Sequence, residues 1–140
     1  MSVIKDKEVA IIGGGPGGLT LARLLQMNGV DVKVYERDVN KDARMQGATL
    51  DLHEESGLYA LRQAGLMDAF NANYRPSADK MKIVDKYANI LFDDDTNGDN
   101  DRSRPEIDRG PLQQILLDSL QPGTVVWDSQ FVSMSQQNGV

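Results

Sequence analysis

The chain has 140 residues, 40% of them hydrophobic, which is enough for one domain with a core or for part of a larger protein. Its formal net charge of −6 argues against nucleic acid as a partner, and no apolar run approaches the roughly 18 residues of a membrane span. The absence of cysteine excludes disulfides, thiolate metal sites and cysteine catalysis. Because the first residues lack the apolar core of a signal peptide, we expect a cytoplasmic protein.

Residues 8–35 predict a β-α-β unit. The apolar run at residues 8–12 predicts a buried strand, and the leucines and alanine after the next loop follow helical spacing. Asn28 and Gly29 are a typical helix stop. The residues that follow, 30–35, predict a second strand.

Between this strand and this helix the chain reads Gly-Gly-Gly-Pro-Gly-Gly, which has the form G-x-G-x-x-G. Such a loop lets backbone N–H groups approach a pyrophosphate at the positive end of a helix. The motif alone is weak, because glycines also make ordinary turns, but its place between a predicted strand and a predicted helix favours a ligand. We therefore predict a dinucleotide site whose loop residues are Gly13, Gly15, Pro16, Gly17 and Gly18.

Glu36 closes the second strand, 18 residues after Gly18 (36 − 18), close to the roughly 20 expected of a ribose-binding carboxylate. A carboxylate accepts hydrogen bonds from both ribose hydroxyls and repels a 2′-phosphate, so Glu36 favours FAD or NAD over NADP at this site. The alternative is a tight glycine turn with no ligand, in which Glu36 is a surface acid at the end of a strand.

The next part of the chain is less regular. Residues 37–47 are polar and charged and predict a loop, and the weak alternation at residues 48–52 predicts a short strand. Residues 55–64 predict a helix, because Leu58 and Leu61 lie on one side and a glycine follows as a stop.

An insertion then interrupts the α/β pattern. Residues 81–84 and 90–92 predict a β-hairpin. The following residues, 93–104, carry five aspartates and predict a solvated acidic loop, because a cation site would need stiffer spacing. We place the inserted hairpin and acidic loop at about residues 78–104.

The last part of the chain predicts a return to the α/β pattern. Residues 111–120 predict a helix with Pro111 in its first position, and residues 124–127 predict a third core strand. The sum is the first half of a Rossmann-like, doubly wound α/β fold with a parallel three-strand core. Right-handed crossovers place its strands in the order third, second, first.

Four segments carry a resemblance to a known family. They begin at Gly13 (Gly-Gly-Gly-Pro-Gly-Gly-Leu-Thr-Leu-Ala), Val34 (Val-Tyr-Glu-Arg), Gly47 (Gly-Ala-Thr-Leu-Asp-Leu-His) and Arg104 (Arg-Pro-Glu-Ile-Asp-Arg-Gly-Pro-Leu). Together they resemble the group A flavin monooxygenases, and within that group the tetracycline-inactivating monooxygenases. The resemblance covers about residues 8–133, and its last two segments are the more specific ones.

The resemblance implies FAD as bound cofactor, NADPH as reductant and a tetracycline-like polycyclic substrate that is hydroxylated. It implies that the glycine loop faces the FAD pyrophosphate and that Glu36 accepts the ribose hydroxyls. By the same resemblance, Arg37 lies by the adenosine, Arg44 matches a position associated with NADPH, and Asp51 and Arg109 match FAD-contacting positions.

Plainer alternatives stay open for several of these residues. Arg44 is equally well a solvated loop arginine, Asp51 a turn cap, and Arg109 a partner of Asp108 or Glu106 in a surface ion pair. His53, the one histidine, is best interpreted as a hydrogen-bonded structural residue. We assign no catalytic residue and no metal site, because flavin chemistry is carried by the cofactor.

The family pattern is incomplete in this chain. Two later FAD-contacting motifs of the family, an Asp-Gly and a Gly-Asp segment, do not occur after the last matched segment, and the resemblance places two further strands beside the first one. Residues 1–140 are therefore expected to be the N-terminal part of an FAD-binding domain, inactive alone, with an open strand edge suited to self-association. The alternatives are part of an NAD- or FAD-dependent reductase, or a non-enzymatic dinucleotide-binding or interaction module from a truncated gene.

Overall fold

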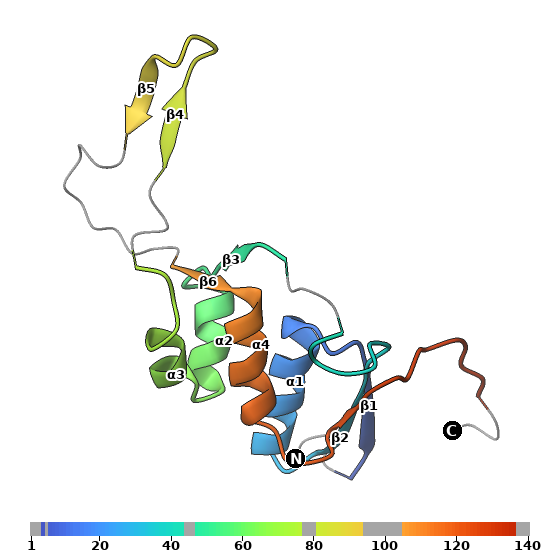
Figure 1. The fold of residues 1–140 in the computed structure, drawn as a ribbon. Helices are drawn as coiled ribbons and strands as arrows, with labels where there is room; N and C mark the ends of the chain where they lie inside the picture. The colour runs from blue at the N-terminus through green and yellow to red at the C-terminus, as the bar shows by residue number, and fades with distance from the viewer. Residues whose placement is uncertain (1–3, 5, 44–46, 77–80, 94–104, 137–140) are drawn as a thin grey trace. The chain divides into compact units, whose positions relative to one another are not determined.

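The computed structural model describes residues 4, 6–43, 47–76, 81–93 and 105–136. The chain divides into two compact units, Met1–Gln46 with Gln113–Val140, and Gly47–Leu112. Figure 1 labels the helices and most of the strands along the chain. None of the helices in the described residues is long and apolar enough to cross a membrane.

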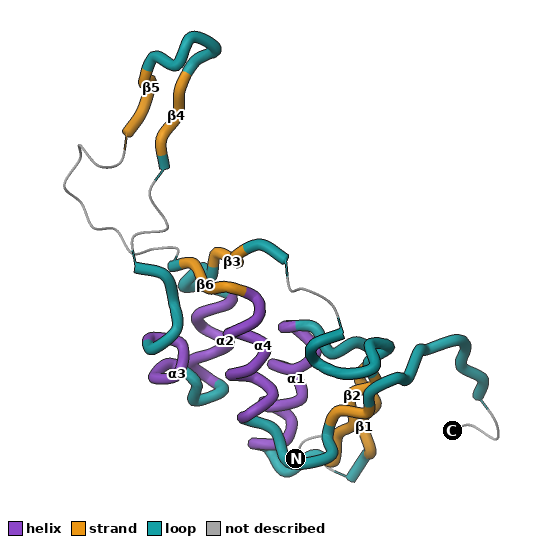
Figure 2. Tube along the Cα trace, in the orientation of Figure 1, coloured by secondary structure: helices purple, strands orange, loops and turns teal. Residues whose placement is uncertain are grey.

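The first unit contains a parallel three-strand sheet in the order β1-β2-β7. It is made of β1 (Glu8–Ile12) and β2 (Asp31–Tyr35), both labelled in Figure 2, and of β7 (Val125–Val126). β1 pairs with β2 along its whole length, and β7 pairs with the end of β2. The predicted strand order is confirmed, although β7 is shorter than residues 124–127. This sheet and the hairpin described below confirm the predicted α/β fold class.

Helix α1 (Pro16–Met27) connects β1 to β2 and covers the sheet with an apolar face. Leu19 and Ala22 are fully buried on it. The helix ends as predicted, because Asn28 is its cap and Gly29 takes a φ of 73°, a left-handed conformation that favours glycine.

The core of the first unit follows the alternation of β2. Val32 and Val34 point inward and are almost fully buried, whereas Asp31 is exposed. The central position of β2 explains this burial, since both of its edges are paired and a helix packs on one face.

The second unit contains two short helices, α2 (Gly57–Gln63) and α3 (Met67–Asn71), and a two-strand antiparallel sheet of β3 (Thr49–Asp51) and β6 (Glu106–Asp108). The helix at residues 55–64 and the strand at residues 48–52 are confirmed within a few residues. Helix α3 and strand β6 were not predicted from the sequence, because both are short. Helix α3 has five residues and buries only Phe70, and β6 has three residues and buries only Ile107.

Helix α4 (Arg109–Asp118) begins two residues before the predicted start. Pro111 is therefore its third residue, not its first. The shift costs no hydrogen bond, because the first N–H groups of a helix have no intrahelical acceptor. The helix buries the side chains of Leu112, Ile115 and Leu116.

The predicted hairpin is confirmed as β4 (Lys82–Val84) paired antiparallel with β5 (Ile90–Asp93). Asp93 was predicted in the acidic loop, but it extends β5 because its carboxylate pairs with the Lys82 ammonium at 2.8 Å. The rest of that predicted loop, residues 94–104, lies outside the described residues.

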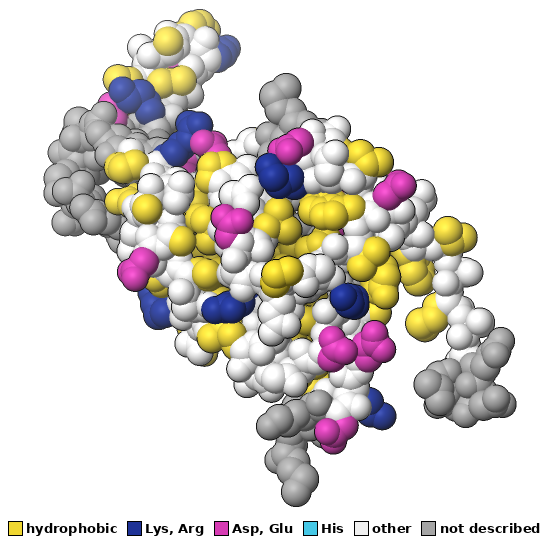
Figure 3. Space-filling view, turned by 60° about the horizontal axis from the view of Figure 1, so that its bottom comes forward, with side chains coloured by type: hydrophobic (Ala, Val, Ile, Leu, Met, Phe, Trp, Pro, Cys, Tyr) yellow, Lys and Arg dark blue, Asp and Glu magenta, His cyan; other side chains and the backbone are white. Residues whose placement is uncertain are grey.

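The space-filling view in Figure 3 shows many hydrophobic side chains on the surface, between scattered acidic and basic ones. The hairpin contributes exposed apolar side chains from both strands and from its turn. They are Ile83, Val84, Tyr87, Ile90 and Leu91.

Candidate functional site

The glycine loop leaves the sheet through a turn at Gly13. Its N–H donates to the Tyr35 carbonyl at 2.9 Å, which extends the pairing of β1 with β2 by one residue. Gly13 then takes a φ of 103°, which a residue with a side chain rarely adopts. This glycine therefore allows the chain to turn from the strand into α1.

The start of α1 presents backbone donors in the way that the motif predicts. Gly15 is the N-cap, Pro16 is the first helical residue, and the Leu19 N–H closes the first turn on the Gly15 carbonyl at 3.0 Å. The N–H groups of Gly17 and Gly18 lie in the first turn and have no intrahelical acceptor. They lie at the positive end of the helix dipole, where an anion is favoured.

The glycines of the loop differ in the space beside them. A Cβ atom on Gly18 would lie 2.1 Å from the Gly13 carbonyl oxygen, so helix and loop pack backbone against backbone there. A Cβ atom on Gly15 or Gly17 would meet nothing within 4 Å. The outer side of the loop is thus open for a pyrophosphate, while its inner side accepts only glycine.

Glu36 lies beside this loop and is only 7% exposed. Its carboxylate accepts a 2.6 Å hydrogen bond from the Gly14 N–H and a 3.0 Å hydrogen bond from the Asp38 N–H. The alternative interpretation as a surface acid is therefore wrong. The structure brings together Gly13–Gly18 and Glu36, as the motif spacing predicts.

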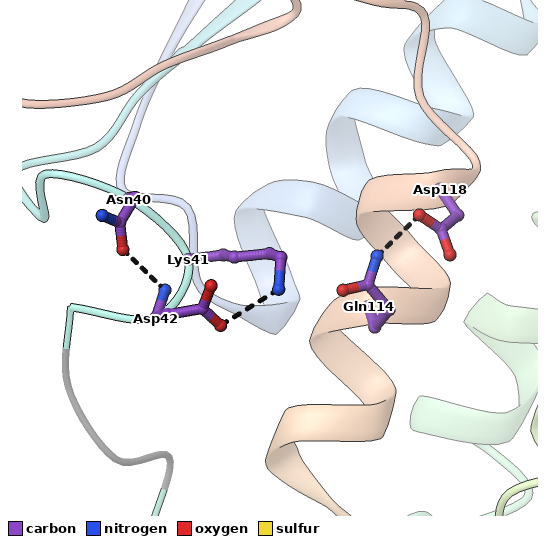
Figure 4. Close-up of polar contacts among 5 residues, drawn as sticks. All are labelled: Asn40, Lys41, Asp42, Gln114 and Asp118. Carbon is purple, nitrogen blue, oxygen red and sulfur yellow. Dashed lines mark hydrogen bonds and ion pairs between the residues drawn. The ribbon is translucent and has the colours of Figure 1, made fainter.

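Arg37 follows directly and is exposed at the edge of the same site. Figure 4 shows the loop beyond it, in which Asn40 Oδ1 accepts the Asp42 N–H at 2.9 Å and Lys41 Nζ pairs with Asp42 at 3.0 Å. These contacts turn the chain locally, and the exposed ion pair contributes little stability. Arg44 lies outside the described residues.

The same view shows a contact on α4. Gln114 donates from its side-chain amide to Asp118 Oδ1 at 2.6 Å, one helical turn further along. Such i,i+4 pairs stabilise the helix that carries Arg109 at its start.

The remaining predicted site residues, Asp51 and Arg109, lie in the second unit. Asp51 is exposed within β3, opposite Glu106 of β6. Arg109 donates from Nε to the Ala48 carbonyl at 3.1 Å. The alternative ion pair between Arg109 and Asp108 is wrong, because the Asp108 carboxylate pairs with a different arginine.

That arginine is Arg75, a residue that the sequence analysis missed. Its Nε and one terminal nitrogen lie 2.9 and 2.8 Å from Asp108 Oδ2, and its N–H donates to the Glu106 carbonyl at 2.8 Å. No motif marks an isolated arginine 33 residues away, so the sequence carried no signal for this pair.

The structure does not support the interpretation of His53 as a residue with a hydrogen-bonded side chain. Its imidazole is about half exposed, and Nδ1 lies 4.0 Å from the Glu55 carboxylate, too far for a hydrogen bond. Its carbonyl oxygen instead accepts the N–H groups of Ser56 and Leu58 at the start of α2.

A parallel β-α-β unit, a glycine loop at a helix start and a buried acid at the end of the second strand define a dinucleotide-binding protein. The family model described as "FAD binding domain" matches residues 6–124. The chain belongs to this family, whose cofactor is FAD.

Relatives and solved structures agree with this assignment. The chain is 35% identical over 138 residues to the monooxygenase asqM of Emericella nidulans, covering 95% of this chain and 30% of asqM. It superposes with a TM-score of 0.74 and 26% identity on a protein of Photorhabdus luminescens assigned as an FAD-containing monooxygenase, covering 94% of this chain and 33% of that one. The tetracycline destructase Tet(55) has a TM-score of 0.71 at 24% identity, with 96% and 33% covered.

The chain spans about a third of the length of these proteins. The resemblance to flavin monooxygenases is confirmed, and tetracycline destructases are among the structural neighbours. The likeness to Tet(55), at 24% identity, concerns the fold.

Proposed function

We propose that residues 13–18 and Glu36 hold the adenosine diphosphate half of FAD in a longer, NADPH-dependent monooxygenase. The observation that carries this proposal is the glycine loop. Its outer side is open, its helix start presents N–H groups that have no intrahelical acceptor, and the buried carboxylate of Glu36 lies beside it. The family assignment supports FAD over NAD as the dinucleotide.

The donors and acceptors of this site match the two halves of the ligand. The N–H groups of Gly17 and Gly18 would bind the pyrophosphate oxygens, with the helix dipole favouring their charge. Each oxygen of the Glu36 carboxylate accepts one backbone N–H, and a carboxylate oxygen can accept more than one hydrogen bond, so Glu36 would also bind a ribose hydroxyl. Arg37 is exposed next to Glu36 and would lie by the adenosine.

Roles for the other predicted site residues are also proposals. Arg109 uses Nε on a backbone carbonyl, which leaves its terminal N–H groups for cofactor oxygens. Asp51 is exposed and would accept hydrogen bonds from FAD. We assign Arg44 to NADPH on the family resemblance.

When bound, the flavin would supply the redox chemistry, and the residues of this chain would bind and orient it. We propose a tetracycline-like polycyclic compound as the substrate and the cytoplasm as the location. The substrate is supported by the fold likeness to tetracycline destructases. We further propose that residues 78–104 are an insertion in this domain and that residues 1–140 alone are inactive.

The visible spectrum and an NADPH oxidation assay test the proposal in the full-length protein and in residues 1–140. We expect stoichiometric FAD and tetracycline-dependent NADPH oxidation with a one-oxygen mass increase of the drug in the full-length protein. Residues 1–140 should bind FAD weakly and oxidise no NADPH. A full-length protein that binds NAD in preference to FAD would refute the cofactor, and unaltered tetracycline would refute the substrate.

A further inference from the structure

We infer that Glu36 is a positioning residue for the glycine loop, in addition to any contact with the ribose. The inference rests on the proposed function only for the ligand that the loop receives. The Glu36 carboxylate accepts the Gly14 N–H at 2.6 Å and the Asp38 N–H at 3.0 Å. One buried anion thus ties the pyrophosphate loop to the end of β2.

Gly14 is the point at which the loop needs such an anchor. It lies between Gly13, with its left-handed φ, and Gly15, the N-cap of α1. Three consecutive glycines have large conformational freedom, and ordering them has a high entropic cost. A short, charge-assisted hydrogen bond to the middle glycine restricts the residues on both sides of it.

Both partners of this hydrogen bond are buried, so water cannot readily replace either of them. Gly14 is buried, and Glu36 is only 7% exposed. A Cβ atom on Gly14 would lie 3.2 Å from both Cβ and Oε2 of Glu36, so loop backbone and acid are in close contact. Without the carboxylate, the Gly14 N–H would lose its acceptor in a place with little access to water.

Glu36 is itself held by its main chain. Its N–H donates to the Val126 carbonyl at 2.9 Å, and its carbonyl accepts the Ser129 N–H at 2.8 Å. The carboxylate therefore projects from a fixed backbone between β2 and the segment after β7. A ribose-binding acid on a free loop would not have this support.

Amide hydrogen exchange in the nucleotide-free protein, resolved to single amides, tests the inference directly. We expect the Gly14 amide to be protected and Glu36→Gln to speed its exchange about tenfold or more, because an uncharged glutamine side chain has one acceptor oxygen for the two N–H groups that the carboxylate binds. Glu8→Gln is the matched control, since it removes the same charge from an exposed residue of the same sheet. Gly14 exchange at the unprotected rate in the unmodified protein would overturn the inference, even if the variant fails to fold.

Nucleotide binding separates positioning from ribose contact. ADP and 2′,3′-dideoxy-ADP share the pyrophosphate, but only ADP has the hydroxyls that Glu36 would accept. Removing a negative charge alone should strengthen binding of both anions. We expect Glu36→Gln to weaken the binding of both nucleotides about fivefold or more, because the loop is no longer held in place. A loss of affinity for ADP alone would overturn the inference. If the unmodified protein binds neither ADP nor FAD, the proposed function fails, while the exchange measurement still decides the role of Glu36.

Discussion

The glycine loop region and the β4–β5 hairpin were both predicted from local sequence, yet the chain packs them very differently. Leu19, directly after the glycine motif, is completely buried, whereas Tyr87 and Leu91 of the hairpin are 74% and 67% exposed. The loop region is held by partners distant in sequence, for example by the hydrogen bond from the Gly14 N–H to the Glu36 carboxylate. The hairpin is held by its own turn and by the pairing of its two strands.

The difference shows that apolar patterning predicts an element without predicting what covers it. A two-strand hairpin alone is marginally stable in water, so its stability depends on its turn and cross-strand contacts. The first unit has a three-strand sheet covered by a helix and can bury its apolar face. Substitutions in the glycine loop region should therefore change the free energy of unfolding, whereas substitutions in the β4–β5 hairpin should change only local order.

The largest expected contrast is between two leucines. Leu19→Ala should lower the free energy of unfolding by about 2–5 kcal/mol, because it leaves a cavity in the core. Leu91→Ala should change it by no more than about 0.5 kcal/mol, since that side chain is mostly exposed. Urea unfolding followed by circular dichroism measures both. Equal losses for the two variants would mean that the hairpin is packed as tightly as the loop region.

The glycine loop offers a second contrast within six residues. Gly18→Ala should destabilise the protein by about 3 kcal/mol, because its Cβ would overlap the Gly13 carbonyl and backbone cannot rotate away. Gly17→Ala is the matched control in the same helical turn, where a Cβ meets nothing. It should be neutral or stabilise by roughly 0.5–1 kcal/mol, since alanine favours a helix.

The same residues show which features of the site could be predicted from the sequence and which could not. Helical spacing predicted that Leu19 lies on the apolar face of α1. The motif marked Gly18 as a loop glycine but did not predict its close approach to the Gly13 carbonyl. The contact of Glu36 with Gly14 was out of reach, because spacing places an acid near a loop but not its hydrogen bonds. For β6, the alternation Glu106, Ile107, Asp108 is too short to signal a strand, and its partner β3 lies more than 50 residues earlier.

A smaller effect is expected at a polar contact that supports the loop region from a distance. Thr124 is buried, accepts the Gln26 side-chain amide at 2.7 Å and donates to the Gln121 carbonyl at 2.7 Å. Thr124→Val keeps the shape but leaves the Gln26 amide without its acceptor, which should cost about 1–2 kcal/mol in urea unfolding. Thr124→Ser should retain most of this stability, and a Val variant as stable as the unmodified protein would contradict the role of this contact.

The smallest expected effect lies in the hairpin turn. Hydrogen bonds from the Asn89 side chain, then from the Asn89 and Tyr87 N–H groups, lower the pKa of Asp85 below its usual 3.8. Because the pKa is lower in the folded turn, the carboxylate stabilises the turn above pH 3.8, and this stabilisation is lost as the pH falls through the folded value.

Nuclear magnetic resonance can follow this titration at the Asp85 carboxyl carbon and the Tyr87 amide. We expect both midpoints below 3.8, and Asn89→Ala should raise them toward it by removing the largest contributor. Amides of the glycine loop should not shift over the same pH range with the Asp85 midpoint, because the turn is held by its own residues. A midpoint at or above 3.8 would show that these hydrogen bonds do not persist in solution, and the hairpin would then lack the polar turn that distinguishes it from the packed loop region.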